Sequence, residues 1–193
     1  MSHEINRDDM LDIAQYEKQR AAIREHVIAQ RKLRRVHVGE IITVAFENAE
    51  TVRYQIQEMM RAERMVDDAA IDFEIATYSE MLPGPNELSA TLFIEIDDTE
   101  RLHEWLPKLV GIEHAVSLEI AGAETAAALG EEGRSREDVT STVHYLKIPL
   151  DDAQAGAIRT GADCALVIDQ ANYAARAELG TEMVAALAAD LGA

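Results

Sequence analysis

The stretch LSATLFIEI, residues 88–96, has the clearest strand pattern in the chain. Every second side chain from Leu88 to Ile96 is apolar, and a period of two residues is typical of a strand with one face on a core. Segment Glu124–Leu129 is expected to pair with the strand before it through a turn at Gly122. The other expected strands are Val36–Val38, Ile41–Phe46, Ala115–Ala121, Thr142–Ile148 and Ala162–Asp169.

Apolar side chains at helical spacing predict helices before and between these strands. The expected helices are Ile13–Lys32, Ala49–Val66 with Asn48 as its N-cap, a helix capped by Asp67 or Asp68 that carries Ile71, Glu100–Leu109, Asp152–Arg159 and Thr181–Leu191. Helices and strands are mixed without strict alternation. This order favours the α+β class, with a mostly antiparallel sheet packed by helices and a helical N-terminal portion.

The organisation predicted is one α+β domain over residues 1–193. In it, residues 1–35 form an N-terminal basic helical segment, and residues 36–193 form a sheet with covering helices. The loop Pro83–Asn86 could divide two halves, but the strand Ile41–Phe46 precedes that loop and would have to join the later sheet. A second loop, Gly130–Asp138, is charged and contains glycine, so we expect it to be mobile.

Charge restricts the classes of partner. The 193 residues include 18 Lys and Arg and 36 Asp and Glu, for a formal net charge of −18. Binding to phosphates requires a surplus of basic side chains, so nucleic acid and anionic membranes are poor candidates for the main partner. One segment departs from this balance, because residues 17–37 hold seven basic residues against two acidic ones. That segment is either a solvated basic face or an arm that binds anions.

Targeting and cofactor signals are lacking. The first ten residues have no apolar run, and no stretch has the length of a membrane span, so we expect a cytoplasmic protein. The single cysteine, Cys164, rules out an internal disulfide and a cysteine-ligated cluster. No glycine-rich phosphate loop, serine elbow or HExxH motif occurs, and Glu100 and His103 form a lone ExxH pair. We therefore predict no cofactor.

The richest polar stretch is residues 46–64, FENAETVRYQIQEMMRAER. Three carboxylates within three helical turns could act as general acid and base or bind a hard cation. Gln55 and Gln57 are unusual choices for a solvated face, and Tyr54 indicates partial burial. The alternative is an amphipathic surface helix stabilised by Glu–Arg pairs. The catalytic candidates are Glu47, Glu50, Glu58 and Arg61, and the binding candidates from this helix are Tyr54, Gln55 and Gln57.

A second polar set follows the strands on their non-core face. Ser89 and Thr91 are further binding candidates, and Ser117 and Glu119 lie on a possible neighbouring strand. If the helix that begins at Asn48 crosses that face, the two polar sets would meet. The hypothesis is that this helix places its acids and amides in a sheltered hollow.

Several motifs together resemble a known bacterial family, domain of unknown function 3501. They are RRVHVG (34–39), FENAET (46–51), QIQEM (55–59), RAER (61–64), ELSATL (87–92) and VGIE (110–113). The resemblance spans nearly the whole chain, but the family has no established activity and so implies no catalytic residues. Genes of the family tend to neighbour those of rubrerythrin-like proteins and Fe–S oxidoreductases. The resemblance therefore implies a role in redox or peroxide metabolism, with any electron carrier held by a partner.

Three functions remain open at this point. The first is an accessory protein that binds an Fe–S oxidoreductase or a rubrerythrin-like partner through its acidic surface. The second is a small metal-assisted enzyme in which Glu47, Glu50 and Glu58 act as ligands or base and Arg61 holds an anionic substrate group. The third is a regulator whose segment Lys18–Arg35 contacts nucleic acid. A homodimer is plausible, because dimers are the commonest assemblies.

Overall fold

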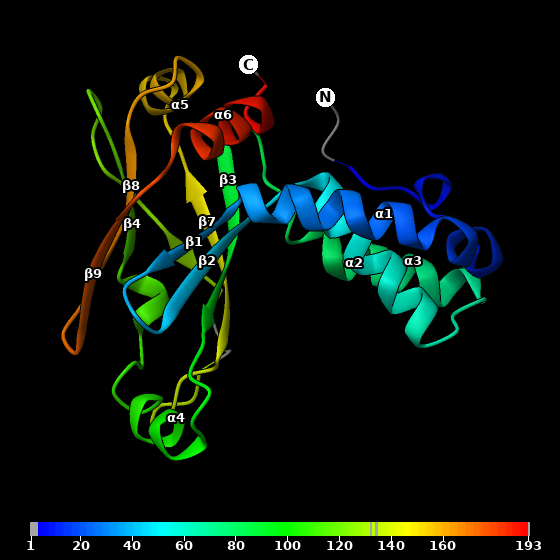
Figure 1. The fold of residues 1–193 in the computed structure, drawn as a ribbon, viewed down its shortest axis with the longest axis horizontal. Helices are drawn as coiled ribbons and strands as arrows, with labels where there is room; N and C mark the ends of the chain where they lie inside the picture. The colour runs from blue at the N-terminus through cyan, green and yellow to red at the C-terminus, as the bar shows by residue number, and fades with distance from the viewer. Residues whose placement is uncertain (1–3, 132, 134, 193) are drawn as a thin grey trace.

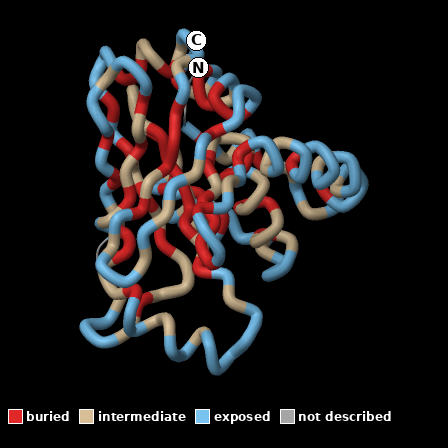
Figure 2. The backbone as a smooth tube through the Cα atoms, turned by 60° about the vertical axis from the view of Figure 1, so that its left-hand side comes forward, coloured by how far each residue is buried: buried red, intermediate tan, exposed pale blue. Residues whose placement is uncertain are grey.

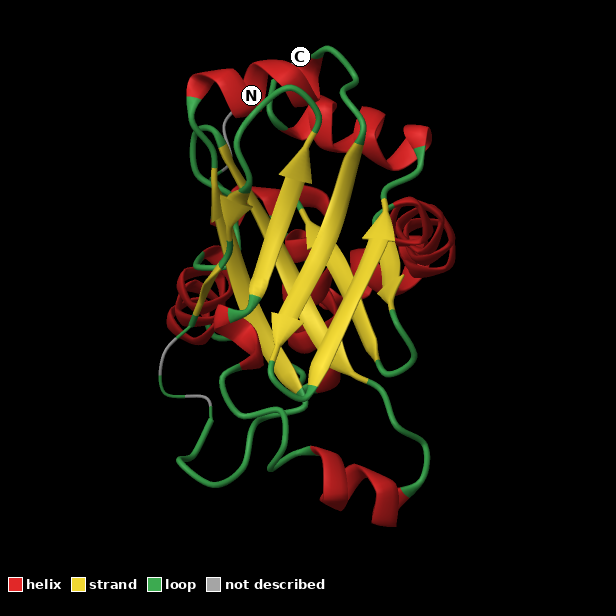
Figure 3. Ribbon diagram, turned by 90° about the vertical axis from the view of Figure 1, so that its left-hand side faces the viewer, coloured by secondary structure: helices red, strands yellow, loops and turns green. Residues whose placement is uncertain are grey.

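The computed structural model describes residues 4–131, 133 and 135–192, whose strands form two sheets packed face to face (Figure 3). Every pair of neighbouring strands is antiparallel. Sheet A has the order β1 (Arg35–Val38), β2 (Ile42–Glu47), β3 (Glu87–Ile94), β7 (Val143–Pro149), β6 (Leu129–Gly130). Sheet B has the order β5 (Ala126–Ala127), β4 (Val116–Ile120), β8 (Cys164–Gln170), β9 (Tyr173–Glu178). The predicted α+β class is confirmed.

The main core lies between the two sheets, where alternate side chains of facing strands meet. On β4 the buried side chains are Val116, Leu118 and Ile120, as the period of two predicts. Strand β3 differs, because Ser89 and Thr91 are as buried as the apolar residues between them. One face of β3 lies on sheet B, and on the other face the Thr91 hydroxyl donates a hydrogen bond to Glu47.

The two sheets are joined along both edges. Residues 126–130 pass from sheet B to sheet A, since β5 pairs with β4 and β6 pairs with β7. Gly130 is required there, because a Cβ atom at this position would lie 2.7 Å from the Cβ of Glu113. At the opposite edge the Tyr173 hydroxyl donates a 2.6 Å hydrogen bond to the carbonyl oxygen of Val38. The strands therefore enclose their core almost as a barrel does.

Three helices, α1 (Ile13–Leu33), α2 (Ala49–Ala62) and α3 (Asp68–Ser79), project together from sheet A, and we call them the helical arm (Figure 1). Helices α5 (Asp152–Arg159) and α6 (Thr181–Asp190) lie over one end of the sheets, and α4 (Thr99–Trp105) lies at the other end. Two short 3-10 helices cover Arg7–Asp9 and Ile112–His114. None of the helices in the described ranges is long and apolar enough to cross a membrane.

Some predicted boundaries are wrong. The helix expected over Ala49–Val66 ends at Ala62. The helix cannot continue through Arg64, because the φ of Arg64 is +53°, outside the right-handed helical region. The helix expected over Glu100–Leu109 ends at Trp105, two residues before Pro107. Strand β9 was not expected, because three of its six residues are alanine. Of the loop expected over Gly130–Asp138, Gly130 belongs to β6, and residues 132 and 134 lie outside the described residues.

The expected neighbour of the β3 polar set is also wrong. Ser117 and Glu119 belong to β4, which is in sheet B and pairs with β5 and β8. Strand β2, in contrast, does pair with β3 across the loop Pro83–Asn86, as the prediction of one domain required. The single-domain organisation itself stays a prediction.

Candidate functional site

Helix α2 begins where strand β2 ends, and its start is anchored to the sandwich. The Asn48 side chain accepts hydrogen bonds from the backbone amides of Glu50 and Thr51, at 3.1 and 3.0 Å, as an N-cap does. Its amide nitrogen donates to Asp190 of α6, 3.2 Å away. Asp190 also forms an ion pair with Arg34, which is only 4 % exposed. The base of the helical arm is thus held by a buried polar cluster.

Glu47 lies in this junction and connects α2 to strand β3. Its two carboxylate oxygens accept hydrogen bonds from the hydroxyls of Thr51 at 2.6 Å and Thr91 at 3.0 Å. Ser89 pairs in register with Glu47 and is buried beside it. The structure therefore brings three of the candidates together, where a buried carboxylate has its hydrogen bonds supplied by hydroxyls.

Glu58 binds helix α1. Arg20 donates to both of its oxygens, at 2.7 and 2.8 Å, and the Tyr16 hydroxyl donates at 2.5 Å. The hydrogen bonds from Arg20, followed by that from Tyr16, lower the pKa of Glu58 to about 2 despite its partial burial. Arg61 lies 3.6 Å from the same carboxylate. A carboxylate whose pKa is this far below neutral pH is a poor general base. The contacts of Glu58 indicate instead that it ties α2 to α1.

Gln57 explains why an amide stands on this face. Its Nε2 donates to the carbonyl oxygen of Leu11, and its Oε1 accepts from the amide of Leu11, both at 2.9 Å. This paired contact fixes the segment that precedes α1. Gln55 lies elsewhere on α2, and its buried Oε1 has no hydrogen-bond partner among the described residues.

The remaining candidates lie beside a cleft between α1 and α2. Glu50, Tyr54 and Gln57 line this cavity of about 480 Å³, together with Ile23, His26 and Val27 of α1 and five other residues. The Nε2 atom of His26 lies 2.7 Å from Oε1 of Glu50. The predicted polar stripe is thus split among three places: the cleft, the Glu58 cluster and the junction with β3.

The hypothesis of a metal-assisted enzyme requires a cluster of metal ligands. Within the part of the chain that the structure describes, no three His, Cys, Asp or Glu side chains gather so that they could hold a metal ion. Cys164 is buried, and burial raises the pKa of its thiol. A buried thiol with a raised pKa is a weak ligand and a weak nucleophile.

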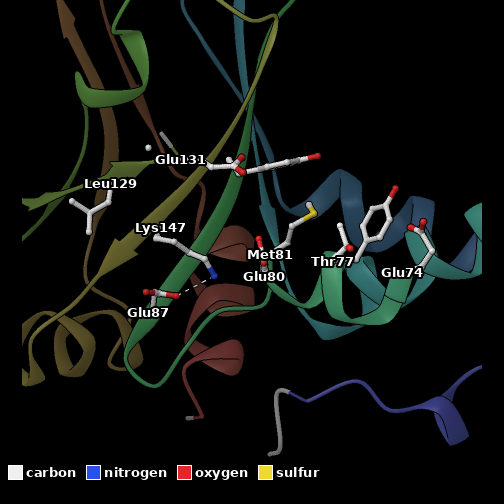
Figure 4. Close-up of a pocket in the computed structure, with 11 residues that line it drawn as sticks. Glu74, Thr77, Glu80, Met81, Glu87, Leu129, Glu131 and Lys147 are labelled. Carbon is white, nitrogen blue, oxygen red and sulfur yellow. Dashed lines mark ion pairs between the residues drawn. The ribbon is translucent and has the colours of Figure 1, made fainter. Parts of the chain in front are cut away.

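A larger hollow, not predicted, lies between helix α3 and the outer face of sheet A, and we call it the α3 groove (Figure 4). It measures about 550 Å³. One wall comes from α3 and the residues after it, and the other from β6 and β7. Its lining residues are Glu74, Thr77, Tyr78, Glu80, Met81, Glu87, Leu129, Gly130, Glu131, Tyr145 and Lys147.

The groove is acidic, although it contains one lysine. The Nζ atom of Lys147 lies 3.2 Å from Oε1 of Glu87 and also donates to the carbonyl oxygen of Leu82. Burial, followed by the charges of Glu74 and Tyr145, raises the pKa of the Tyr78 hydroxyl. The alternation of Tyr145 and Lys147 predicts that they share a face of β7. No local pattern predicts that α3 packs opposite them, because that contact joins segments about 70 residues apart.

Comparison with known proteins gives a family without a stated activity. The family model described as "Protein of unknown function (DUF3501)" matches residues 4–191. The crystal structure of a novel protein of unknown function from Burkholderia pseudomallei K96243, at 1.90 Å resolution, shares 33 % sequence identity with this chain. It superposes with a TM-score of 0.91 and covers 97 % of this chain and 98 % of its own. No curated protein matches the chain. The chain belongs to the DUF3501 family, as its resemblance in sequence predicts.

Proposed function

We propose that the protein is an accessory protein that docks a partner protein through the helical arm. The observation that carries this proposal is where large apolar side chains meet solvent. Among the described residues, those exposed are Ile28 (50 %), Leu33 (37 %), Val66 (81 %), Phe73 (69 %) and Leu129 (58 %). Ile28, Leu33 and Phe73 lie on helices of the arm, and Val66 lies in the connection between α2 and α3. Leu129 lies on the wall of the α3 groove that faces the arm. Exposed apolar side chains gathered on one part of a protein are typical of an interaction surface.

The exposure of helix α1 supports the same proposal. It has 21 residues, yet only Tyr16 and Val27 are buried. Figure 2 shows exposed backbone along the outside of the arm, whereas in α2 only Arg53 and Ala62 are exposed. Because α1 buries so few side chains, its position depends mainly on its contacts with α2. These include the hydrogen bonds that Tyr16 and Arg20 donate to Glu58.

The basic segment favours a protein partner over nucleic acid. Three of its seven basic side chains are already in ion pairs: Arg20 with Glu58, Arg34 with Asp190 and Arg35 with Glu95. Their charges are neutralised within the protein, so fewer cations remain to displace counterions from a phosphate backbone. A gel shift that stays absent at low salt would support this.

The partner that we propose is an Fe–S oxidoreductase or a rubrerythrin-like protein acting in redox metabolism. The resemblance to the family suggests it through the neighbouring genes. The buried thiol of Cys164 supports it, because a redox centre ligated by cysteine would then have to belong to the partner. The net charge of −18 would guide encounter with a partner whose docking surface is basic.

Calorimetric titration of the full chain with each purified candidate partner tests this proposal. Binding is expected with at least one of them, and it should weaken as salt rises because charge contributes to encounter. Val66→Ser combined with Phe73→Ser should weaken it at least tenfold. The matched control is His103→Ser combined with Glu104→Ser, two exposed positions on α4 that lie outside the arm. Absence of binding to both partner classes, or equal loss with the control, would contradict the proposal.

A further inference from the structure

The α3 groove has a chemistry that selects among ligands. Its lining has four glutamates and one lysine, and that lysine is held by Glu87 and by a backbone carbonyl. An anionic group placed there would meet repulsion from carboxylates on both walls. A cationic group would be attracted, and the partial shelter of the groove reduces screening by salt.

Two tyrosine rings define the walls. Tyr78 belongs to α3 and Tyr145 to β7. Met81, on the same wall as Tyr78, also lines the groove (Figure 4). The face of an aromatic ring attracts a cation, and a methionine side chain packs against an alkyl chain. The groove therefore suits a positive charge at the end of an apolar stem better than a bare metal ion.

Exposed apolar surface extends from Leu129 in the lining of the groove to Phe73 outside it. Phe73 lies one turn before Thr77 on α3, so the two side chains point to the same side of the helix. Across the groove, Leu129 is 58 % exposed on β6. A small free amine would occupy only part of the groove of about 550 Å³ and would leave Phe73 in water and Leu129 largely uncovered. A side chain presented by a protein would bring its apolar neighbours onto both.

We propose that the α3 groove binds a lysine or arginine side chain of the partner protein, with apolar residues of the partner covering Phe73 and Leu129. This inference rests on the proposed docking function and names the contact at its centre. The stem of the basic side chain packs between Tyr78 and Tyr145, and its charged end is neutralised by the carboxylates of the groove.

Nuclear magnetic resonance of the isotopically labelled full chain tests the inference with defined probes. The probes are a capped pentapeptide, Leu-Ala-Lys-Ala-Leu, the same peptide with norleucine in place of lysine, and free butylammonium. The lysine peptide should shift the amides of residues 74–81, 129–131 and 145–147. It should bind about tenfold more tightly than the norleucine peptide. Equal affinity for the two peptides, or shifts confined to other residues, would overturn the inference, as would butylammonium binding as tightly as the lysine peptide.

A pair of charge variants separates the groove from the general acidity of the chain. Glu74→Gln with Glu80→Gln should weaken binding of the lysine peptide about fivefold, because two carboxylates of the lining are lost. Asp97→Asn with Glu104→Gln removes the same charge at exposed positions around α4 and should leave the affinity unchanged. Equal weakening by both double variants would show attraction to net charge alone, and the groove would lose its role.

The two proposals can fail separately. If a candidate partner binds and Glu74→Gln with Glu80→Gln has no effect on it, docking uses another part of the arm and this inference is wrong. If the lysine peptide binds the groove and neither candidate partner binds, the groove stands and the proposed function is wrong.

Discussion

Glu58 lies between α2 and α1, where the Tyr16 hydroxyl and the Arg20 guanidinium both bind its carboxylate. The pKa of about 2 is below the ordinary value of 4.5, so the folded state favours the ionised form. Stability from this lowered pKa is fully present above about pH 4.5 and is lost as the pH falls toward 2. The side chains of Arg20 and Glu58 are 31 % and 24 % exposed, so this ion pair contributes less to stability than a fully buried pair.

We therefore expect Glu58→Gln to lower the free energy of unfolding by about 2 kcal/mol at pH 7. The difference from the unmodified protein should shrink between pH 4.5 and pH 2, because the carboxylate becomes protonated in that range. Urea unfolding across this pH range measures it. Glu63→Gln, at the exposed end of α2, is the control and should show no such pH dependence. A difference that is constant with pH would contradict the tether.

Two glycines give a matched pair of backbone tests. Gly130→Ala places a Cβ atom 2.7 Å from the Cβ of Glu113, and we expect it to lower the free energy of unfolding by about 1–3 kcal/mol. Gly156 lies within helix α5 with open space where a Cβ would stand, so Gly156→Ala should stabilise by about 0.5–1 kcal/mol. Differential scanning calorimetry measures the stability of both variants. Equal effects of the two changes would contradict the close packing of Gly130 on Glu113 where residues 126–130 pass from sheet B to sheet A.

At this scale the sequence predicts residue types better than roles. An amide on a solvated face needs an explanation, and the two hydrogen bonds between Gln57 and Leu11 supply one. Glu47 meets Thr91 from the end of strand β2, which pairs with β3, and not from helix α2. Glu58 could not be assigned, since its partner Arg20 is 38 residues away in the sequence. Whether any of these residues binds or reacts with a ligand stays a prediction.

Between elements, the arm is attached to the sandwich by Arg34 and Asp190. Arg34 follows α1, and Asp190 ends α6, so their ion pair joins distant parts of the chain. Asn48, the N-cap of α2, binds the same carboxylate. Burial makes this pair costly to break, because removing one partner leaves the other charged and unpaired.

Arg34→Met is expected to cost about 3–5 kcal/mol of unfolding free energy. Arg35→Met is the control, because its pair with Glu95 is exposed, and exposed pairs contribute less than about 1 kcal/mol. Chemical denaturation gives both values. Hydrogen exchange should also quicken in α1 and in the first turn of α2 for Arg34→Met. Similar costs for the two variants would show that the arm is held in another way.

Element boundaries followed local patterns where those patterns were complete. The bounds predicted for α5 are those observed, because Asp151 caps its first turn and Gly161 follows its end. The sequence does not predict strand β9, since its alternating exposure is carried by alanines that have little hydropathy contrast. Nor does it predict the division into two sheets. A period of two identifies a strand but not its neighbour, which depends on contacts between distant segments.

The whole molecule consists of a closed sandwich and a helical arm that projects from it. The sandwich buries most of its apolar side chains, while Ile28 and Phe73 of the arm, and Val66 between α2 and α3, are exposed on a chain with a net charge of −18. Surface of that kind is expensive to leave in water and is retained where a partner covers it. The central claim is therefore that the arm is a docking surface for another protein.

Site-specific photo-crosslinking in the native host cell tests this claim most directly. A photoreactive phenylalanine analogue at position 73, on the exposed side of α3, should give one discrete adduct with an Fe–S oxidoreductase or a rubrerythrin-like protein, identified by mass spectrometry. The same analogue at position 104 on α4 should give none. No adduct from position 73, or the same set of adducts from both positions, would contradict the claim.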